Sequence, residues 1–200
     1  LLPWAARHAA GSWPALGARR WWVVLGAGLA LALHFATWIA SLSLTSVAAS
    51  VLLVNTTPLF SLALGRLLLR ERSSGLVVLG TLLALAGTAV IVQGDSAGGP
   101  EPLKGDALAL AGALTLSLYH LAGRGLRDAL PLSAYVLAVW SSAALALGLL
   151  AAAFGTRMLG HPPRAWLAFL ALAVIPTLGG HGLVNRALRQ LPAPTVGLFM

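Results

Sequence analysis

The chain has 200 residues, of which 58% are hydrophobic and only 9% charged, with a formal net charge of +8. Soluble domains average about 25% charged residues, so this composition excludes an ordinary soluble protein. A nucleic-acid-binding face is excluded as well, because the basic residues occur in twos and threes rather than in one cluster. The sequence contains no cysteine, which excludes disulfides and thiolate metal sites.

The charged residues separate apolar stretches, each about as long as the roughly 20 helical residues that cross a bilayer. After a tail and connector over residues 1–20, we expect spans over about 21–44, 47–69, 75–92, 106–122, 132–154 and 165–183. A seventh span begins near Pro192 and stops at Met200, inside a helix. Transmembrane strands alternate polar and apolar residues, whereas these runs are apolar on every face. The predicted fold class is therefore all-α, a polytopic transmembrane helix bundle with six whole spans.

Lysine and arginine residues in alternate loops predict the orientation of the chain. Three of them lie on one side, at Lys104, Arg157 and Arg164, and the other ten lie on the opposite side. Those ten are Arg7, Arg19, Arg20, Arg66, Arg70, Arg72, Arg124, Arg127, Arg186 and Arg189. Cytoplasmic loops carry the excess of positive charge, so we expect the side with ten to face the cytoplasm.

An internal repeat relates the two halves of the chain. A shift of 146 residues places segment 41–47 on segment 187–193, and in both a helix ends, a short link follows and a new span begins. The first of these helices leaves the cytoplasm and its partner enters it, so the halves are inverted, as in many transporters. We expect a first repeat over 1–95, an extracytoplasmic linker over 96–104 and a second repeat over 105–200.

Four stretches carry a family resemblance: FATWIASLSLTSVAASVLLVNTTP (35–58), LLLRER (67–72), GTLLALAGTAVIVQ (80–93) and GDALALAGALTLSLYHLAGRGLR (105–127). They resemble the third to sixth helices of EamA-type exporters in the drug/metabolite transporter superfamily. The resemblance implies two inverted five-helix repeats in the inner (cytoplasmic) membrane of a bacterium. It also implies that this chain covers the end of helix two to the start of helix nine.

Polar residues inside the spans are the candidates for binding. Asn55, Thr56 and Thr57 precede Pro58 near the middle of the second span. Proline removes a backbone hydrogen bond, and a helix broken in this way can line a substrate cavity at the midplane. The alternative is that the threonine hydroxyls bond back to their own helix and Pro58 only kinks it.

His34, Thr37, Trp38 and Ser41 share one face of the first span, which should point into the bundle. Trp38 either stacks on an aromatic or cationic substrate or fills a gap. A single buried histidine such as His34 is more often satisfied by a neighbouring hydroxyl or carbonyl than used for binding.

In the second half, Tyr119 and His120 lie toward the end of one span, and His181 and Asn185 lie one turn apart in another. His181 falls within one residue of the repeat partner of His34. We therefore predict a pseudo-symmetric pair of histidines, with simple helix packing as the alternative.

None of the acidic residues lies in the middle of a span, so proton coupling would need a histidine, or a carboxylate in helices outside this sequence. Glu71 comes nearest, and we expect it to pair locally with Arg70 or Arg72. Arg186 and Arg189 are expected to extend to the cytoplasmic surface rather than to bind an anionic substrate.

No catalytic pattern is present: the Gly-Asp pairs at Asp95 and Asp106 lie at span ends, and neither HExxH nor GxxxxGK[ST] occurs. We predict no enzyme, metal or cofactor. The predicted function is a secondary carrier that exports a small metabolite, amino acid or drug-like compound by alternating access. The substrate-binding residues predicted for it are His34, Trp38, Asn55, Thr56, His181 and Asn185. The alternative is a noncatalytic membrane-assembly subunit, and the oligomeric state stays open.

Overall fold

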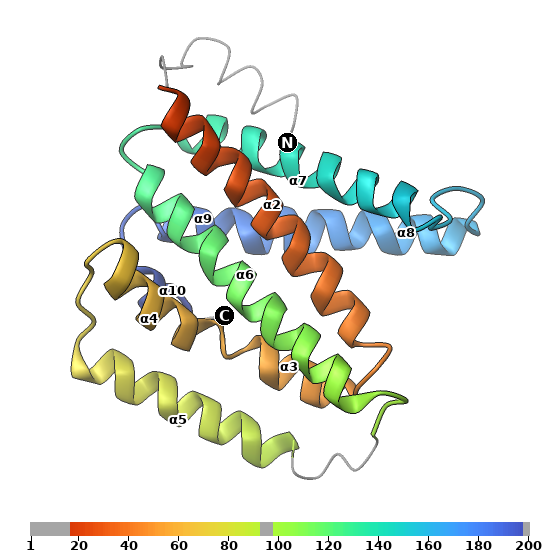
Figure 1. Cartoon of the computed structure of the whole chain (residues 1–200), viewed down its shortest axis with the longest axis horizontal. Coiled ribbons are helices and arrows are strands. Elements are labelled where there is room, and N and C mark those ends of the chain that lie inside the picture. The colour runs from red at the N-terminus through yellow and green to blue at the C-terminus, as the bar shows by residue number, and fades with distance from the viewer. Residues whose placement is uncertain (1–16, 93–97, 198–200) are drawn as a thin grey trace.

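The computed structural model describes residues 17–92 and 98–197, and every regular element within these ranges is a helix (Figure 1). The helices are α2 (Ala18–Ser41), α3 (Val47–Val54), α4 (Thr57–Leu68), α5 (Gly75–Val92), α6 (Pro102–Leu126), α7 (Leu132–Ala153), α8 (Pro163–Leu172), η1 (Ala173–His181), α9 (Gly182–Ala187) and α10 (Ala193–Gly197). The predicted all-α class is confirmed. Arg7, Asp95, the first residues of the expected linker and Met200 lie outside the described residues.

In the part of the chain that the structure describes, four helical stretches meet the usual length and hydropathy of a membrane span: Ala18–Ser41, Val47–Leu68, Leu132–Ala153 and Pro163–Ala187. A shorter apolar stretch covers Gly75–Gly87. The 25 residues of α6 rise about 1.5 Å each, which gives about 37 Å and would also cross a bilayer. Its charged residues, Lys104, Asp106 and Arg124, lie near its two ends, as a membrane helix requires.

Helix α6 is central, because α2, α3, α4 and α10 all pack against it (Figure 1). Helix α2 packs against both α6 and α7, and the buried core between these three helices includes Val24, Leu31, Tyr119 and Val139. Helices α2 and α7 come close together at Gly28, where an added Cβ atom would lie 1.8 Å from the Ser142 Oγ atom and 2.9 Å from the Val139 carbonyl oxygen. Small residues at such positions allow helices to approach closely in a membrane.

The second span is interrupted, because α3 ends at Val54 and α4 begins at Thr57. Pro58 has no backbone N–H group to donate to the Val54 carbonyl four residues earlier. That carbonyl instead accepts a hydrogen bond from the Thr57 hydroxyl at 2.7 Å. The break is therefore stabilised locally, in the way that the kink alternative supposed.

The span predicted over residues 165–183 is not one regular helix but consists of α8, the π-helix η1 and α9. Pro176 lies inside η1 and again leaves a carbonyl without its helical donor. The hydroxyl of Thr177 donates to the Leu172 carbonyl at 3.0 Å, across the five-residue spacing of a π-helix. The sequence analysis did not predict this distortion.

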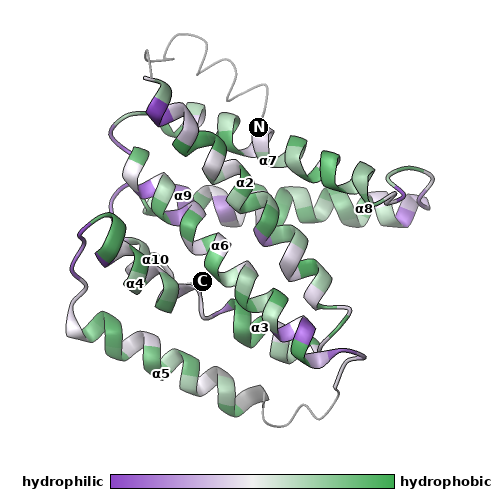
Figure 2. Cartoon of the chain, in the orientation of Figure 1, coloured by the Kyte–Doolittle hydropathy of each residue, from purple (hydrophilic) through white to green (hydrophobic). Residues whose placement is uncertain are grey.

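Burial increases along this span from α8 to α9. Neither α8 nor η1 contains a buried residue, whereas Asn185 and Leu188 are 3% and 1% exposed. Figure 1 shows α8 and the end of α7 extending away from the ends of α3 and α6 that carry Ser46 and Pro102. Most residues of these diverging helices are hydrophobic (Figure 2).

Candidate functional site

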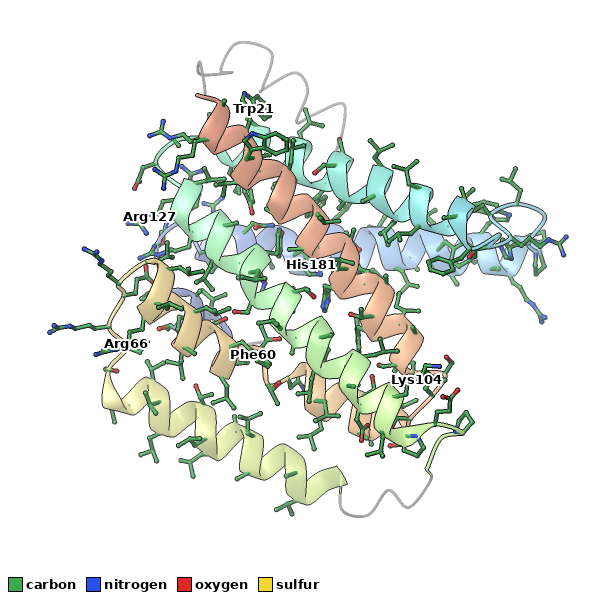
Figure 3. The ribbon with its side chains drawn as sticks, viewed as in Figure 1. Trp21, Phe60, Arg66, Lys104, Arg127 and His181 are labelled. Atoms are coloured by element: carbon green, nitrogen blue, oxygen red, sulfur yellow. The ribbon has the colours of Figure 1, made fainter. Side chains whose placement is uncertain are left out.

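Side chains from α2, α6, α7, η1 and α9 meet in the middle of the bundle and form what we call the ring cluster. It consists of His34, Phe35, Trp38, Tyr119, His120, Trp140, His181 and Asn185. Figure 3 shows His181 at mid-depth, between Arg66 and Arg127 at one end and Lys104 at the other. Four of the six predicted binding residues therefore lie together in one place.

His34 is 2% exposed, and its Nδ1 atom lies 2.9 Å from the Gly112 carbonyl of α6. Because a carbonyl only accepts, Nδ1 of His34 is the donor in this bond. The His34 ring stacks on Trp38, with centroids 5.6 Å apart and planes inclined by 19°. One nitrogen of His34 is thus satisfied by a carbonyl, as the packing alternative supposed.

Phe35 lies beside both His34 and His181. The centroids of the Phe35 and His34 rings are 5.1 Å apart, and those of Phe35 and His181 are 5.6 Å apart. The His181 ring also meets Tyr119 edge-on at 6.2 Å. Phe35 therefore links the two histidines predicted to be pseudo-symmetric.

The Tyr119 hydroxyl is the main polar junction of the cluster. It accepts hydrogen bonds from Asn185 Nδ2 at 2.5 Å and from Trp140 Nε1 at 3.4 Å. Asn185 Nδ2 also donates to the His181 carbonyl at 2.9 Å. These bonds tie α9 and α7 to the central helix.

Most of the buried side-chain polar atoms that lack a hydrogen-bond partner in the described ranges belong to the ring cluster. They are Trp38 Nε1, both ring nitrogens of His120 and Nδ1 of His181, whereas Glu71 Oε2 lies elsewhere. Leaving such an atom unsatisfied costs about 1–3 kcal/mol. The cluster therefore offers several donors and acceptors that a bound polar molecule could satisfy.

Asn55 and Thr56 lie apart from the cluster, at the break between α3 and α4. Thr57 Oγ1 is 3.4 Å from the Ala113 carbonyl, and Ala113 follows the Gly112 that bonds His34. The break and His34 thus meet α6 at the same depth. The Thr56 hydroxyl donates to the Leu53 carbonyl at 2.6 Å, and Asn55 is exposed.

The arginine-rich end of the bundle holds a network that differs from the prediction. Glu71 does not pair with Arg70 or Arg72: its Oε1 atom lies 2.8 Å from Nε of Arg124 in α6. The prediction was wrong because it considered only neighbours in sequence, whereas α6 lies beside the end of α4. Arg124 also donates to the Leu188 carbonyl at 3.2 Å.

Arg189 is half-buried at the arginine-rich end of the bundle, at the loop between α6 and α7. Its guanidinium donates to the carbonyls of Leu130 and Arg127, at 2.9 and 2.7 Å. Beside it lies a cavity of about 10 Å³, with Tyr135 and Asn185 in its lining, which has room for about one water molecule.

Phe35 and Trp140 belong to the ring cluster but were not predicted from the sequence. Phe35 is next to the predicted His34, but aromatic residues inside an apolar span follow no spacing that separates site residues from packing residues. Among the described residues, no group of three or more histidine and acidic side chains is placed to hold a metal ion.

The family model of the EamA-like transporter family matches residues 1–93 and 103–200. A solved crystal structure of another protein is similar to this chain, with a TM-score of 0.75 and 25% sequence identity. The alignment covers 98% of this chain and 69% of that one. None of the curated proteins matches the chain.

Proposed function

Because the chain belongs to the EamA-like transporter family, whose members are membrane transporters and not enzymes, we propose that it works as a secondary carrier. Its two inverted halves would export a small metabolite, amino acid or drug-like compound by alternating access. In this proposal His34, Trp38, His181 and Asn185 contact the substrate from the ring cluster. Asn55 and Thr56 contact it from the break between α3 and α4.

One observation carries the proposal: a buried cluster of polar and aromatic side chains joins both halves in the middle of the bundle. Phe35 in the first half touches His181 in the second, and His34 in the first half bonds the Gly112 carbonyl in the second. Polar groups inside a membrane are expensive to bury, and they mark substrate pathways in many transporters. In the ring cluster the free-energy cost of burial is increased by several polar side-chain atoms that lack a hydrogen-bond partner.

The backbone supports the inverted repeat that alternating access requires. Helices α2 and α9 end at residues 41 and 187, and α3 and α10 begin at residues 47 and 193, so both pairs differ by 146 (187 − 41 and 193 − 47). Hydrogen bonds recur at the same offset: Leu44 N to Ser41 O corresponds to Gln190 N to Ala187 O, both at 2.9 Å.

If a proton gradient drives transport, the histidines of the ring cluster would bind and release the transported proton. The acidic residues of the described ranges, Glu71, Glu101, Asp106 and Asp128, lie in loops or near helix ends. His120 and His181 instead lie at mid-depth with ring nitrogens that have no partner. A histidine in such a place can take up and release a proton as the site opens.

The purified full-length protein in liposomes tests the function. Candidate solutes would come from an untargeted comparison of the metabolites that cells export with and without the protein. Flux of such a solute in liposomes that contain no other protein is expected. If no solute crosses unless a second protein is added, the carrier proposal fails and the assembly-subunit alternative is supported.

A further inference from the structure

The guanidinium of Arg124 joins three helix ends at the arginine-rich end of the bundle. Its Nε atom pairs with Glu71 just after α4, and its Nη1 atom donates to the Leu188 carbonyl just after α9. The Arg124 and Glu71 side chains are 12% and 17% exposed, so the pair is largely shielded from water. We call Glu71, Arg124 and the Leu188 carbonyl the clamp.

An apolar layer lies beside the clamp and connects the same helices. Leu121 of α6 packs with Leu188, Ala193 and Val196, and the half-buried Leu64, Leu69, Val184 and Ala187 surround them. Arg189 adds a second tie, because it binds carbonyls at the end of α6 and in the loop before α7. Salt bridge, carbonyl bonds and apolar packing thus close one end of the bundle.

Among residues 17–92 and 98–197, the opposite end shows no matching closure around α8. The contacts there join the turn after α2 to the start of α6: Thr45 Oγ1 donates to Asp106 at 2.8 Å, and Glu101 N donates to the Leu44 carbonyl at 3.1 Å. Helix α8 has no buried residue. The π-helix η1, which contains Pro176, lies between α8 and α9. It therefore separates the exposed helix α8 from α9, whose end is bonded to Arg124.

We infer that the clamp is the cytoplasmic gate of the carrier, seen closed. The inference rests on the proposed function, since only alternating access requires a gate, and on the predicted orientation, which places the arginine-rich end at the cytoplasm. Opening toward the cytoplasm separates Arg124 from Glu71 and from the Leu188 carbonyl. Glu71 Oε2 has no partner in the closed state, and water reaches it when the gate opens.

The test measures how fast a buried position behind the clamp reacts from the cytoplasmic side. The printed sequence contains no cysteine, so Leu121→Cys places one reporter thiol in the apolar layer of the full-length protein, with any cysteine elsewhere replaced by serine. Inside-out vesicles are treated with a membrane-impermeant maleimide. Glu71→Gln and Arg124→Gln should each speed labelling about tenfold or more, because removing one partner of a shielded pair destabilises the closed state.

Two further variants serve as controls for the labelling experiment. Arg66→Gln removes the same charge from the same end, at an exposed residue for which the described structure gives no ion pair, and it should label at the parent rate. Arg124→Lys keeps the positive charge next to Glu71, but it lacks the guanidinium group that binds Glu71 and the Leu188 carbonyl at the same time. The reporter thiol in this variant should therefore be labelled at an intermediate rate. It keeps the proposal testable if Arg124→Gln fails to insert.

Labelling at the parent rate in Glu71→Gln and in both Arg124 variants, with normal insertion, would overturn the gate. Faster labelling in Arg66→Gln as well would also overturn it, because a general charge effect would then explain the result. The measurement needs no substrate. A protein that shows the expected labelling but moves no solute would therefore contradict the proposed function, and the clamp would then stand only as the closure of this end of the bundle.

Discussion

Asn185 of α9 donates a hydrogen bond to the Tyr119 hydroxyl of α6 at 2.5 Å, and the two residues are 3% and 0% exposed. This bond attaches the distorted span of the second half to the central helix at the depth of the ring cluster. The same hydroxyl accepts from Trp140. The Tyr119 hydroxyl therefore helps to hold α9, and with it His181, against the central helix.

Tyr119→Phe should destabilise the bundle. It removes the acceptor shared by Asn185 and Trp140 and leaves buried donors unsatisfied, at a cost of about 1–3 kcal/mol. Thermal unfolding in detergent, followed by size-exclusion chromatography of the surviving protein, would show a lower midpoint. Tyr135→Phe is the matched control, because its hydroxyl makes only a 3.4 Å bond to the Tyr119 carbonyl, and a smaller shift is expected. Equal shifts in both variants would contradict the assigned role of Tyr119.

Gly28→Ala should disrupt the contact between α2 and α7. The added Cβ would lie 1.8 Å from Ser142 Oγ and 2.9 Å from the Val139 carbonyl oxygen, so the backbones must separate. Overpacking of this kind costs about 1–3 kcal/mol. Gly26→Ala changes a glycine of the same helix whose added Cβ meets nothing within 4 Å. The yield of monodisperse protein should fall for Gly28→Ala alone, and an equal fall in both would argue against this packing.

Thr57→Val should cost more stability than Thr115→Val, although both remove a buried or half-buried hydroxyl. Thr57 supplies the donor that the Val54 carbonyl loses to Pro58. The hydroxyl of Thr115 donates to carbonyls of Ala111 and Gly112 inside the regular helix α6, which have helical donors as well. We expect a cost of about 1–3 kcal/mol for Thr57→Val and less than about 1 kcal/mol for Thr115→Val. Chemical denaturation in mixed micelles can compare them, and the reverse order would show that the break is not held by Thr57.

Much of the fold could be predicted from where charges are absent. A charge at the centre of a membrane is costly, so apolar runs bounded by arginine define spans directly. Pro58 also indicated an interrupted helix, because a missing N–H group acts within one helical turn. The π-helix at Ala173–His181 was not predicted although Pro176 marks it, since proline alone does not distinguish a kink from a change in helix type.

The polar residues of the ring cluster could be predicted from the sequence, but the residues that they contact could not. His34, Trp38, His181 and Asn185 stood out because polar residues are rare in the spans. Their linking partner Phe35 did not, because an aromatic residue in an apolar run has no distinguishing pattern. The partner of Glu71 was missed for a related reason: sequence spacing shows neighbours along one helix, and Arg124 lies 53 residues away on another.

Substrate flux into liposomes that contain full-length protein with Asn55→Leu or His34→Leu tests the central claim most directly. Asn55 is exposed and His34 bonds one carbonyl of α6, so both variants should insert normally. Thr115→Val serves as the control for a change in a span outside the site. The account predicts that flux falls at least several-fold in both site variants and is unchanged in the control. Unchanged flux in both site variants, at equal amounts of inserted protein, would contradict it.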